Sequence, residues 1–153
     1  IKFIMQKCYL ALGCFWKPEE TFRSIKGIVE TEVGYAGGKN KEVTYEEICT
    51  GNTGHAETVK ITFEEKLISF EKILEYFFNI HDPTQKDMQY PDVGTQYRSE
   101  IFYENKEQKK LAEKYKKSFS EKTTRKIETK ISELKNYCKA EEYHQKYIMK
   151  RGL

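Results

Sequence analysis

The 153-residue sequence lacks several features that would place it in common classes of protein. It has no apolar run near the length of a membrane-spanning helix, which needs about 20 residues. Its four cysteines form no C-x-x-C pair and no cysteine–histidine cluster with zinc spacing, so we expect no metal site. Internal repeats and low-complexity linkers are also missing. One soluble globular domain covering residues 1–153 is therefore expected.

The cysteine content indicates a cellular compartment. Four cysteines are too few for a disulfide scaffold in a chain of this length. The opening stretch "IKFIMQKCYLALGCFW" does not resemble a signal peptide, because Lys7 interrupts it and no small-residue cleavage site follows. We therefore expect a reducing, cytoplasmic environment.

The net charge of +3 hides an uneven distribution. Residues 104–153 contain 15 Lys and Arg against 8 Asp and Glu, whereas the rest of the chain is net negative. Because this C-terminal third of the chain is basic, a nucleic-acid-binding module is the non-enzymatic alternative. Lys and Glu alternate there and no recognition motif is present, so solvated helix faces are favoured and no nucleic-acid or membrane partner is expected.

Hydrophobic periodicity and turn residues predict strands and helices that are mixed along the chain, which favours an α+β or α/β fold with one central sheet. The predicted strands cover residues 2–12, 27–38, 55–63, 99–104 and 125–134. The predicted helices cover residues 18–25, 44–49, 69–81, 105–119 and 140–150, with Thr44 and Ser69 as N-caps. Residues 82–98 are predicted to form a long loop, and loops of that length are usually functional or disordered.

Cys14 is the candidate nucleophile. It follows Gly13 at a predicted strand-to-helix turn, whereas Cys8, Cys49 and Cys138 are expected to be packed, inert thiols. Free amide groups at a helix N-terminus stabilise a thiolate, so we expect the Cys14 pKa to lie below its ordinary value.

Aromatic side chains accompany this thiol. Phe15 and Trp16 follow it directly, and Tyr45 and Tyr97 occur in polar loop contexts. An aromatic cage beside a nucleophile suits a small apolar group, such as a methyl, or a cation.

Two further stretches carry polar groups. In "YEEICTGNTGHAETV", burial next to Ala56 and Val59 would raise the pKa of Glu57 and keep it protonated as a general acid. His55 leaves open a cysteine hydrolase built from Cys14, His55 and Asp92.

The second stretch, "PDVGTQYRS", places Asp92, Gln96, Tyr97 and Arg98 around Gly94. Tyr and Asp side chains there could hydrogen-bond a ligand oxygen. An ion pair between Arg98 and Asp92 that only fixes the loop is the alternative.

Six segments together resemble one known family. "GCFW", "GYAGG", "YEEICTGNTGHAE", "HDPTQ", "DVGTQYRS" and "AEEYHQKY" occur in this order over nearly the whole chain. In this they are similar to the A-type peptide methionine sulfoxide reductases, which act on the S epimer of the sulfoxide. The resemblance implies a single catalytic domain with an α+β fold, a ferredoxin-like βαβ core with a mixed central sheet and flanking helices.

The same resemblance implies a role for each matching residue. Cys14 would attack the sulfoxide sulfur and become a sulfenic acid, while Glu57 would protonate the sulfoxide oxygen. Tyr45 and Tyr97 would hydrogen-bond that oxygen, with Asp92 in the same polar patch, and Phe15 and Trp16 would hold the ε-methyl group. Free methionine sulfoxide or oxidised proteins would be substrates, and no cofactor would be required.

Recycling of Cys14 has two possible routes. Many family members use a cysteine in a C-terminal glycine-rich tail, whereas this sequence has only Cys138 near its end. As a resolving thiol, Cys138 would form a disulfide that thioredoxin reduces. As a packed side chain, which we favour, it would leave the sulfenic acid to an external thiol such as glutathione with glutaredoxin.

Overall fold

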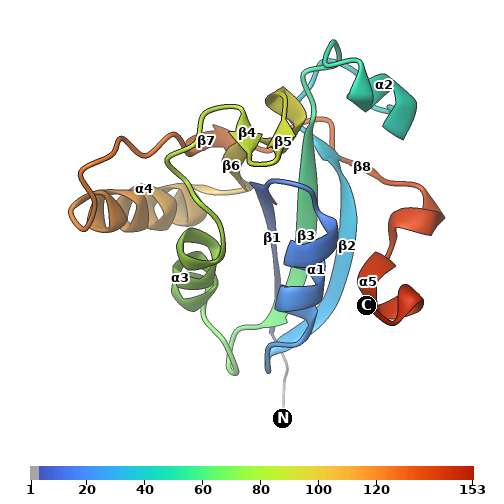
Figure 1. Cartoon of the computed structure of the whole chain (residues 1–153). Helices are drawn as coiled ribbons and strands as arrows, with labels where there is room; N and C mark the ends of the chain where they lie inside the picture. Colours follow the sequence, from blue (N-terminus) through green and yellow to red (C-terminus); the bar gives the residue numbers. More distant parts are fainter. Residues whose placement is uncertain (1–3) are drawn as a thin grey trace.

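The computed structural model describes residues 4–153, and its centre is a mixed six-stranded sheet with helices around it (Figure 1). The strands lie in the order β7-β6-β1-β3-β2-β8. Their bounds are β1 Met5–Leu12, β2 Ile28–Ala36, β3 Ala56–Glu64, β6 Ser99–Tyr103, β7 Lys130–Glu133 and β8 Cys138–Lys139. The helices are α1 Trp16–Arg23, α2 Tyr45–Cys49, α3 Phe70–Ile80, α4 Lys106–Ser120 and α5 Tyr147–Arg151.

The four inner strands have the ferredoxin-like arrangement that the resemblance implies. Strand β3 lies between β1 and β2 and is antiparallel to both, so β1 and β2 are parallel and α1 connects them. Strand β6 then pairs antiparallel with the outer edge of β1 after α3. The α+β class and the mixed sheet are thus confirmed, and the split β-α-β unit places the β1–α1 turn at one end of the sheet.

Helix α3 illustrates how the sequence determines the packing. Its predicted apolar residues are all buried, and they are Phe70, Ile73, Leu74, Phe77 and Phe78. Its predicted N-cap, Ser69, accepts a hydrogen bond from the Lys72 amide. The other predicted cap, Thr44, forms a full capping box with Glu47 at the start of α2.

The C-terminal segment differs from the single helix predicted over residues 140–150. It contains strand β8, a 3₁₀ turn (η2, Glu142–His144) and the short helix α5. The Gln145 side chain is the reason, because it bonds to both the N–H and the C=O of Val33, each over less than 3 Å. Lys146 then takes a left-handed conformation with φ of 48°, which interrupts the helix.

The predicted long loop is ordered by short elements. It holds a two-stranded hairpin, β4 Met88–Gln89 and β5 Asp92–Val93, and a 3₁₀ turn η1, Thr95–Tyr97. In Figure 1 this segment lies above α1, at the same end of the sheet as the β1–α1 turn. Along residues 4–153, no helix is long and apolar enough to cross a membrane.

Candidate active site

Cys14 occupies the turn between β1 and α1. Gly13 precedes it with φ of +97°, and a Cβ atom there would come within 2.9 Å of the Gln89 side chain. Glycine is therefore required both by the backbone conformation and by the close approach of the 82–98 segment. Cys14 itself is partly exposed and opens into a hollow of about 500 Å³, which Asp92 and Lys17 also line.

Glu57 lies beside this turn, although 42 residues separate it from Phe15 in sequence. It projects from β3, is 2% exposed, and accepts a hydrogen bond of 3.2 Å from the backbone amide of Phe15. Because that amide adjoins Cys14, the structure brings together the nucleophile and the acid that the sequence singled out.

The surroundings favour the neutral form of Glu57. Burial is the largest cause that raises the pKa of this carboxyl to about 8, and the negative charge of Asp92 acts in the same direction. The Phe15 amide opposes the shift but does not cancel it. At neutral pH the side chain is therefore mostly a protonated carboxylic acid, as the sequence predicted.

The prediction for the Cys14 pKa is wrong in direction. Burial is the largest cause that raises this pKa to about 12, and the charges of Glu57 and Asp92 act in the same direction. The Trp16 amide does lower it, as expected at a helix start, but one amide is outweighed. The charge of Glu57 acts on Cys14 only when Glu57 is ionised. Because both pKa values lie above 7, Cys14 is a thiol and Glu57 is mostly a neutral carboxyl in the resting protein at neutral pH.

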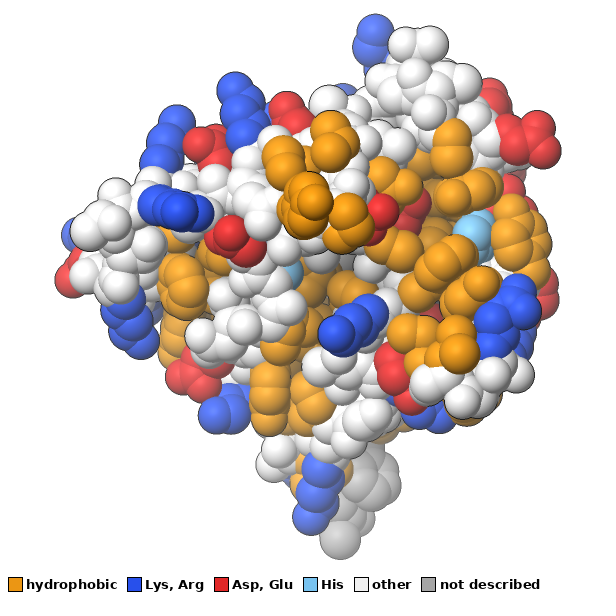
Figure 2. All heavy atoms as spheres, in the orientation of Figure 1, with side chains coloured by type: hydrophobic (Ala, Val, Ile, Leu, Met, Phe, Trp, Pro, Cys, Tyr) orange, Lys and Arg blue, Asp and Glu red, His pale blue; other side chains and the backbone are white. Residues whose placement is uncertain are grey.

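An aromatic cluster forms one wall of the site. Trp16 stacks on Tyr147 with 3.7 Å between ring centroids and 5° between ring planes, and its indole N–H donates to His144 Nδ1 at 3.0 Å. The Phe15 ring is 1% exposed and packs beneath the cluster against Tyr35 and His144. Figure 2 shows hydrophobic side chains gathered on this face, where α1, α2 and the C-terminal segment meet.

The two tyrosines singled out by the sequence also approach the thiol and the carboxyl. Burial is the largest cause that raises the pKa of each, and the charges of Glu57 and Cys14 act on both hydroxyl groups. The pKa of Tyr45 rises to about 12, partly because its hydroxyl hydrogen-bonds to Cys49. Both phenols therefore remain hydrogen-bond donors at neutral pH.

Sequence reasoning missed Glu141 as a residue of this site. Its two carboxylate oxygens accept hydrogen bonds of 2.8 Å from the Tyr35 hydroxyl and the Tyr45 amide. It thereby ties the C-terminal segment to the start of α2. The "AEEYHQKY" segment carried the signal, since it contributed to the resemblance, but no residue in it was given a role.

The other cysteines differ from one another in their surroundings. Cys8 is buried in β1, as predicted, whereas Cys49 is exposed at the end of α2, so the prediction of a packed thiol is wrong there. Helix α2 is too short to bury more than Ile48. Cys138 is partly buried in β8, not at a helix start, and its thiol donates to the Val43 carbonyl over 3.8 Å.

Arg98 and His55 have partners outside the thiol pocket. Arg98 pairs with Glu100 over 2.6 Å, and not with Asp92 as the loop-fixing alternative required. His55 is buried, and its Nε2 bonds to the Asn136 carbonyl.

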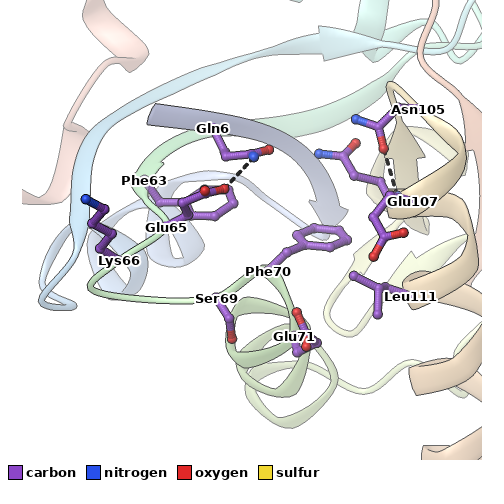
Figure 3. A pocket seen from close by; sticks show the side chains of 11 residues that line it. Gln6, Phe63, Glu65, Lys66, Ser69, Phe70, Glu71, Asn105, Glu107 and Leu111 are labelled. Atoms are coloured by element: carbon purple, nitrogen blue, oxygen red, sulfur yellow. Dashed lines mark hydrogen bonds between the residues drawn. The ribbon is translucent and has the colours of Figure 1, made fainter. Parts of the chain in front are cut away.

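A second hollow, of about 440 Å³, lies near the other end of the sheet, between β1, β3, α3 and α4 (Figure 3). Its lining includes Phe63, Phe70 and Leu111 with glutamates at its rim, and Gln6 donates to Glu65 across it. No cysteine or histidine lines it. Within residues 4–153, no group of three or more His, Cys, Asp or Glu side chains could hold a metal ion.

Comparison with known proteins agrees with the family resemblance of the sequence. A family model described as peptide methionine sulfoxide reductase matches residues 6–152. The chain is 56% identical to the peptide methionine sulfoxide reductase MsrA of Pelagibacter ubique, over 96% of this chain and all of that one. It is 47% identical to the MsrA of Methanosarcina acetivorans, over 97% of this chain and 80% of that one.

Solved structures show the same fold. Reduced Mxr1 from Saccharomyces cerevisiae superimposes with a TM-score of 0.93 at 38% identity, covering 97% of this chain and 86% of that one. Mxr1 in complex with Trx2 gives a TM-score of 0.67 at 28% identity, covering 96% and 89%. This chain belongs to the peptide methionine sulfoxide reductase MsrA family and is an enzyme that reduces methionine sulfoxide.

Proposed function

We propose that the enzyme reduces the S epimer of methionine sulfoxide, free or in oxidised proteins, with Cys14 as nucleophile and Glu57 as proton donor. The observation that carries the proposal is the contact of Glu57 with the Phe15 amide, which sets a buried neutral acid beside a partly exposed thiol. A sulfoxide oxygen is a poor leaving group until it is protonated, and protonation makes the sulfur electrophilic.

The proton balance requires only these two groups. Glu57 gives its proton to the sulfoxide oxygen, Cys14 Sγ bonds to the sulfur, and the thiol proton passes to the Glu57 carboxylate. The S–O bond of the substrate and the new Sγ–S bond then both break as the hydroxyl moves to Cys14 Sγ, which releases methionine and leaves a sulfenic acid. One sulfoxide is reduced, one thiol is oxidised, and Glu57 ends protonated as it began.

The remaining site residues would place the substrate. Tyr45 and Tyr97 keep their protons and would donate hydrogen bonds to the oxygen. Trp16 would contact the ε-methyl group, with Phe15 supporting it from below. Asp92 lines the thiol hollow and would act through its charge on Glu57.

For recycling, an external thiol such as glutathione with glutaredoxin remains our preferred route. Cys138 bonds to the Val43 carbonyl and lines a separate hollow with residues of the α2 region, which suits a packed thiol. The solved complex of yeast Mxr1 with Trx2 supports the alternative, in which Cys138 resolves the sulfenic acid and thioredoxin reduces the disulfide. Thiol-based recycling of either kind suits a reducing cytoplasm, where the four unpaired cysteines would remain thiols.

The substrate assignment is tested with separated epimers. The protein is incubated with methionine-S-sulfoxide or methionine-R-sulfoxide and dithiothreitol, and methionine is quantified. We expect turnover of the S epimer alone and none with Cys14→Ser. Reduction of both epimers, or activity that survives Cys14→Ser, would contradict the proposal.

Recycling is tested by counting free thiols after a single turnover without reductant. Loss of one thiol, unchanged in Cys138→Ser and Cys49→Ser, supports an external reductant. Loss of two thiols that becomes one in Cys138→Ser establishes Cys138 as the resolving cysteine.

The cysteine hydrolase alternative has lost its support. His55 is bonded to the Asn136 carbonyl, and the chain belongs to a reductase family. Glu57→Gln should therefore damage activity more than His55→Asn does.

A further inference from the structure

His144 lies at the centre of the aromatic cluster, and neither the sequence analysis nor the mechanism above gives it a role. It is 1% exposed, and its ring centroid is 4.6 Å from that of Tyr45 and 5.2 Å from that of Phe15. The Tyr143 ring covers it from the same segment at 4.2 Å. A histidine in such surroundings could be replaced by an apolar ring if packing were its only task.

The hydrogen bond to Trp16 defines the protonation state of this imidazole. An indole N–H can only donate, so Nδ1 must be an unprotonated acceptor and the ring proton must lie on Nε2. Nε2 is buried and has no hydrogen-bond partner among the described residues. The fold therefore tolerates an unpaired polar atom in order to keep an acceptor facing Trp16.

Apart from His144, the Trp16 ring has one aromatic neighbour among the described residues, Tyr147, and that contact leaves one freedom open. The parallel stack with Tyr147 fixes the plane of the indole, and Arg151 lies over the far face of Tyr147 at 4.1 Å. A stack permits rotation of the indole within its plane, whereas a hydrogen bond to its N–H does not. His144 supplies that last constraint.

We infer that His144 is a positioning residue that locks the Trp16 indole through its Nδ1 acceptor and so sets the shape of the methyl-binding wall. The effect on substrate depends on the proposed function, in which Trp16 contacts the ε-methyl group. The effect on Trp16 itself does not depend on that function and is measurable in the free protein.

Protonation of His144 would remove this acceptor. Burial lowers its pKa, and the charge of Glu141 opposes the shift. The other titratable groups that face it are the phenols of Tyr45 and Tyr143, which are neutral in the same range. The neutral ring thus persists at physiological pH.

Trp16 is the single tryptophan of the sequence, so tryptophan fluorescence reports on this residue alone. The matched variants are His144→Asn, whose amide oxygen can replace Nδ1, and His144→Gln, whose oxygen falls near Nε2 and leaves the indole N–H without an acceptor. We expect His144→Gln to lower the fluorescence anisotropy and to increase acrylamide quenching of Trp16, and His144→Asn to match the wild type. His55→Asn, a buried histidine bonded elsewhere, is the control and should change neither signal.

In turnover, His144→Gln should raise KM for methionine sulfoxide about two- to ten-fold, as one hydrogen bond of ordinary net strength would give, with kcat nearly unchanged. The His144→Gln variant should also discriminate less between methyl and ethyl sulfoxides. In a Trp16→Phe background, the His144→Asn and His144→Gln variants should no longer differ in KM. Circular dichroism shows whether each variant is folded. Where His144→Gln does not fold, the fluorescence of His144→Asn tests the inference.

Equal Trp16 fluorescence in the folded Gln and Asn variants would overturn the inference, and so would altered fluorescence in a folded His144→Asn. A mobile indole with unchanged KM would leave the inference standing and refute instead the assignment of Trp16 to the methyl site.

Discussion

Two buried carboxyl groups on the same sheet have opposite surroundings. Glu100 in β6 is 4% exposed and is paired with Arg98, whose guanidinium also donates to the carbonyls of Thr95 and Gly54. Glu57 in β3 is 2% exposed and accepts a hydrogen bond from the Phe15 backbone amide, and the negative charge of Asp92 lies nearby. One buried carboxyl thus has a guanidinium as its partner, whereas the surroundings of the other favour its neutral form.

We expect the largest effect from removing the acidic proton of Glu57. Glu57→Gln keeps the shape of the side chain and its hydrogen bond but cannot donate an acidic proton. We expect kcat/KM for methionine-S-sulfoxide to fall by about 10²- to 10⁴-fold, the usual contribution of general acid catalysis. Glu100→Gln is the comparison variant, and an equal loss of activity per folded molecule in both would remove the distinction between the two carboxyls.

The same substitution should change the pH dependence of stability. The folded-state pKa of Glu57, about 8, lies above its ordinary value of 4.5, so its neutral form stabilises the fold fully below pH 4.5. That stabilisation is lost as pH rises towards 8, by at most about 5 kcal/mol. Urea unfolding of wild type and Glu57→Gln between pH 5 and 9 should show the variant gaining relative stability with pH, and parallel curves would contradict this.

Removing the cation from the other carboxyl should destabilise the protein. Arg98→Met leaves Glu100 buried without its partner, and we expect a loss of about 3–5 kcal/mol in the free energy of unfolding. The double variant with Glu100→Met should recover much of that loss. Additive destabilisation in the double variant would show that the pair does not act as a unit.

A smaller effect concerns the charge next to Glu57. Asp92 raises the pKa of Glu57, so Asp92→Asn should lower that pKa. Because the proposed mechanism needs Glu57 in its protonated form, the alkaline limb of the kcat/KM profile, expected near pH 8 in the wild type, should move to lower pH. An unshifted limb would assign it to another group.

The sequence predicted those features that depend on neighbouring residues. The apolar face of α3 and the caps at Thr44 and Ser69 are local patterns, and each is confirmed. The prediction of a single helix over residues 140–150 was wrong because Gln145 forms hydrogen bonds with Val33, more than 100 residues away. A local pattern carries no information about such a partner.

The candidate site shows the same limit. Residues from four separate segments meet there, and their proximity was expected only because of the family resemblance. The prediction for the Cys14 pKa was wrong in direction because the turn was considered alone, whereas burial by the surrounding segments raises this pKa most and the carboxyls of Glu57 and Asp92 add to the increase when they are ionised. The sequence analysis missed His144 and Glu141 because their hydrogen-bond partners lie far away along the chain.

The central claim is that Glu57 is a neutral carboxylic acid in the resting enzyme at physiological pH. Infrared difference spectra between wild type and Glu57→Gln test it directly, because a protonated carboxyl has its own C=O stretching band. We predict that band in the wild-type spectrum at pH 6.5 and its replacement by a carboxylate band with a midpoint near pH 8. A carboxylate band already complete at pH 6.5 would contradict the account.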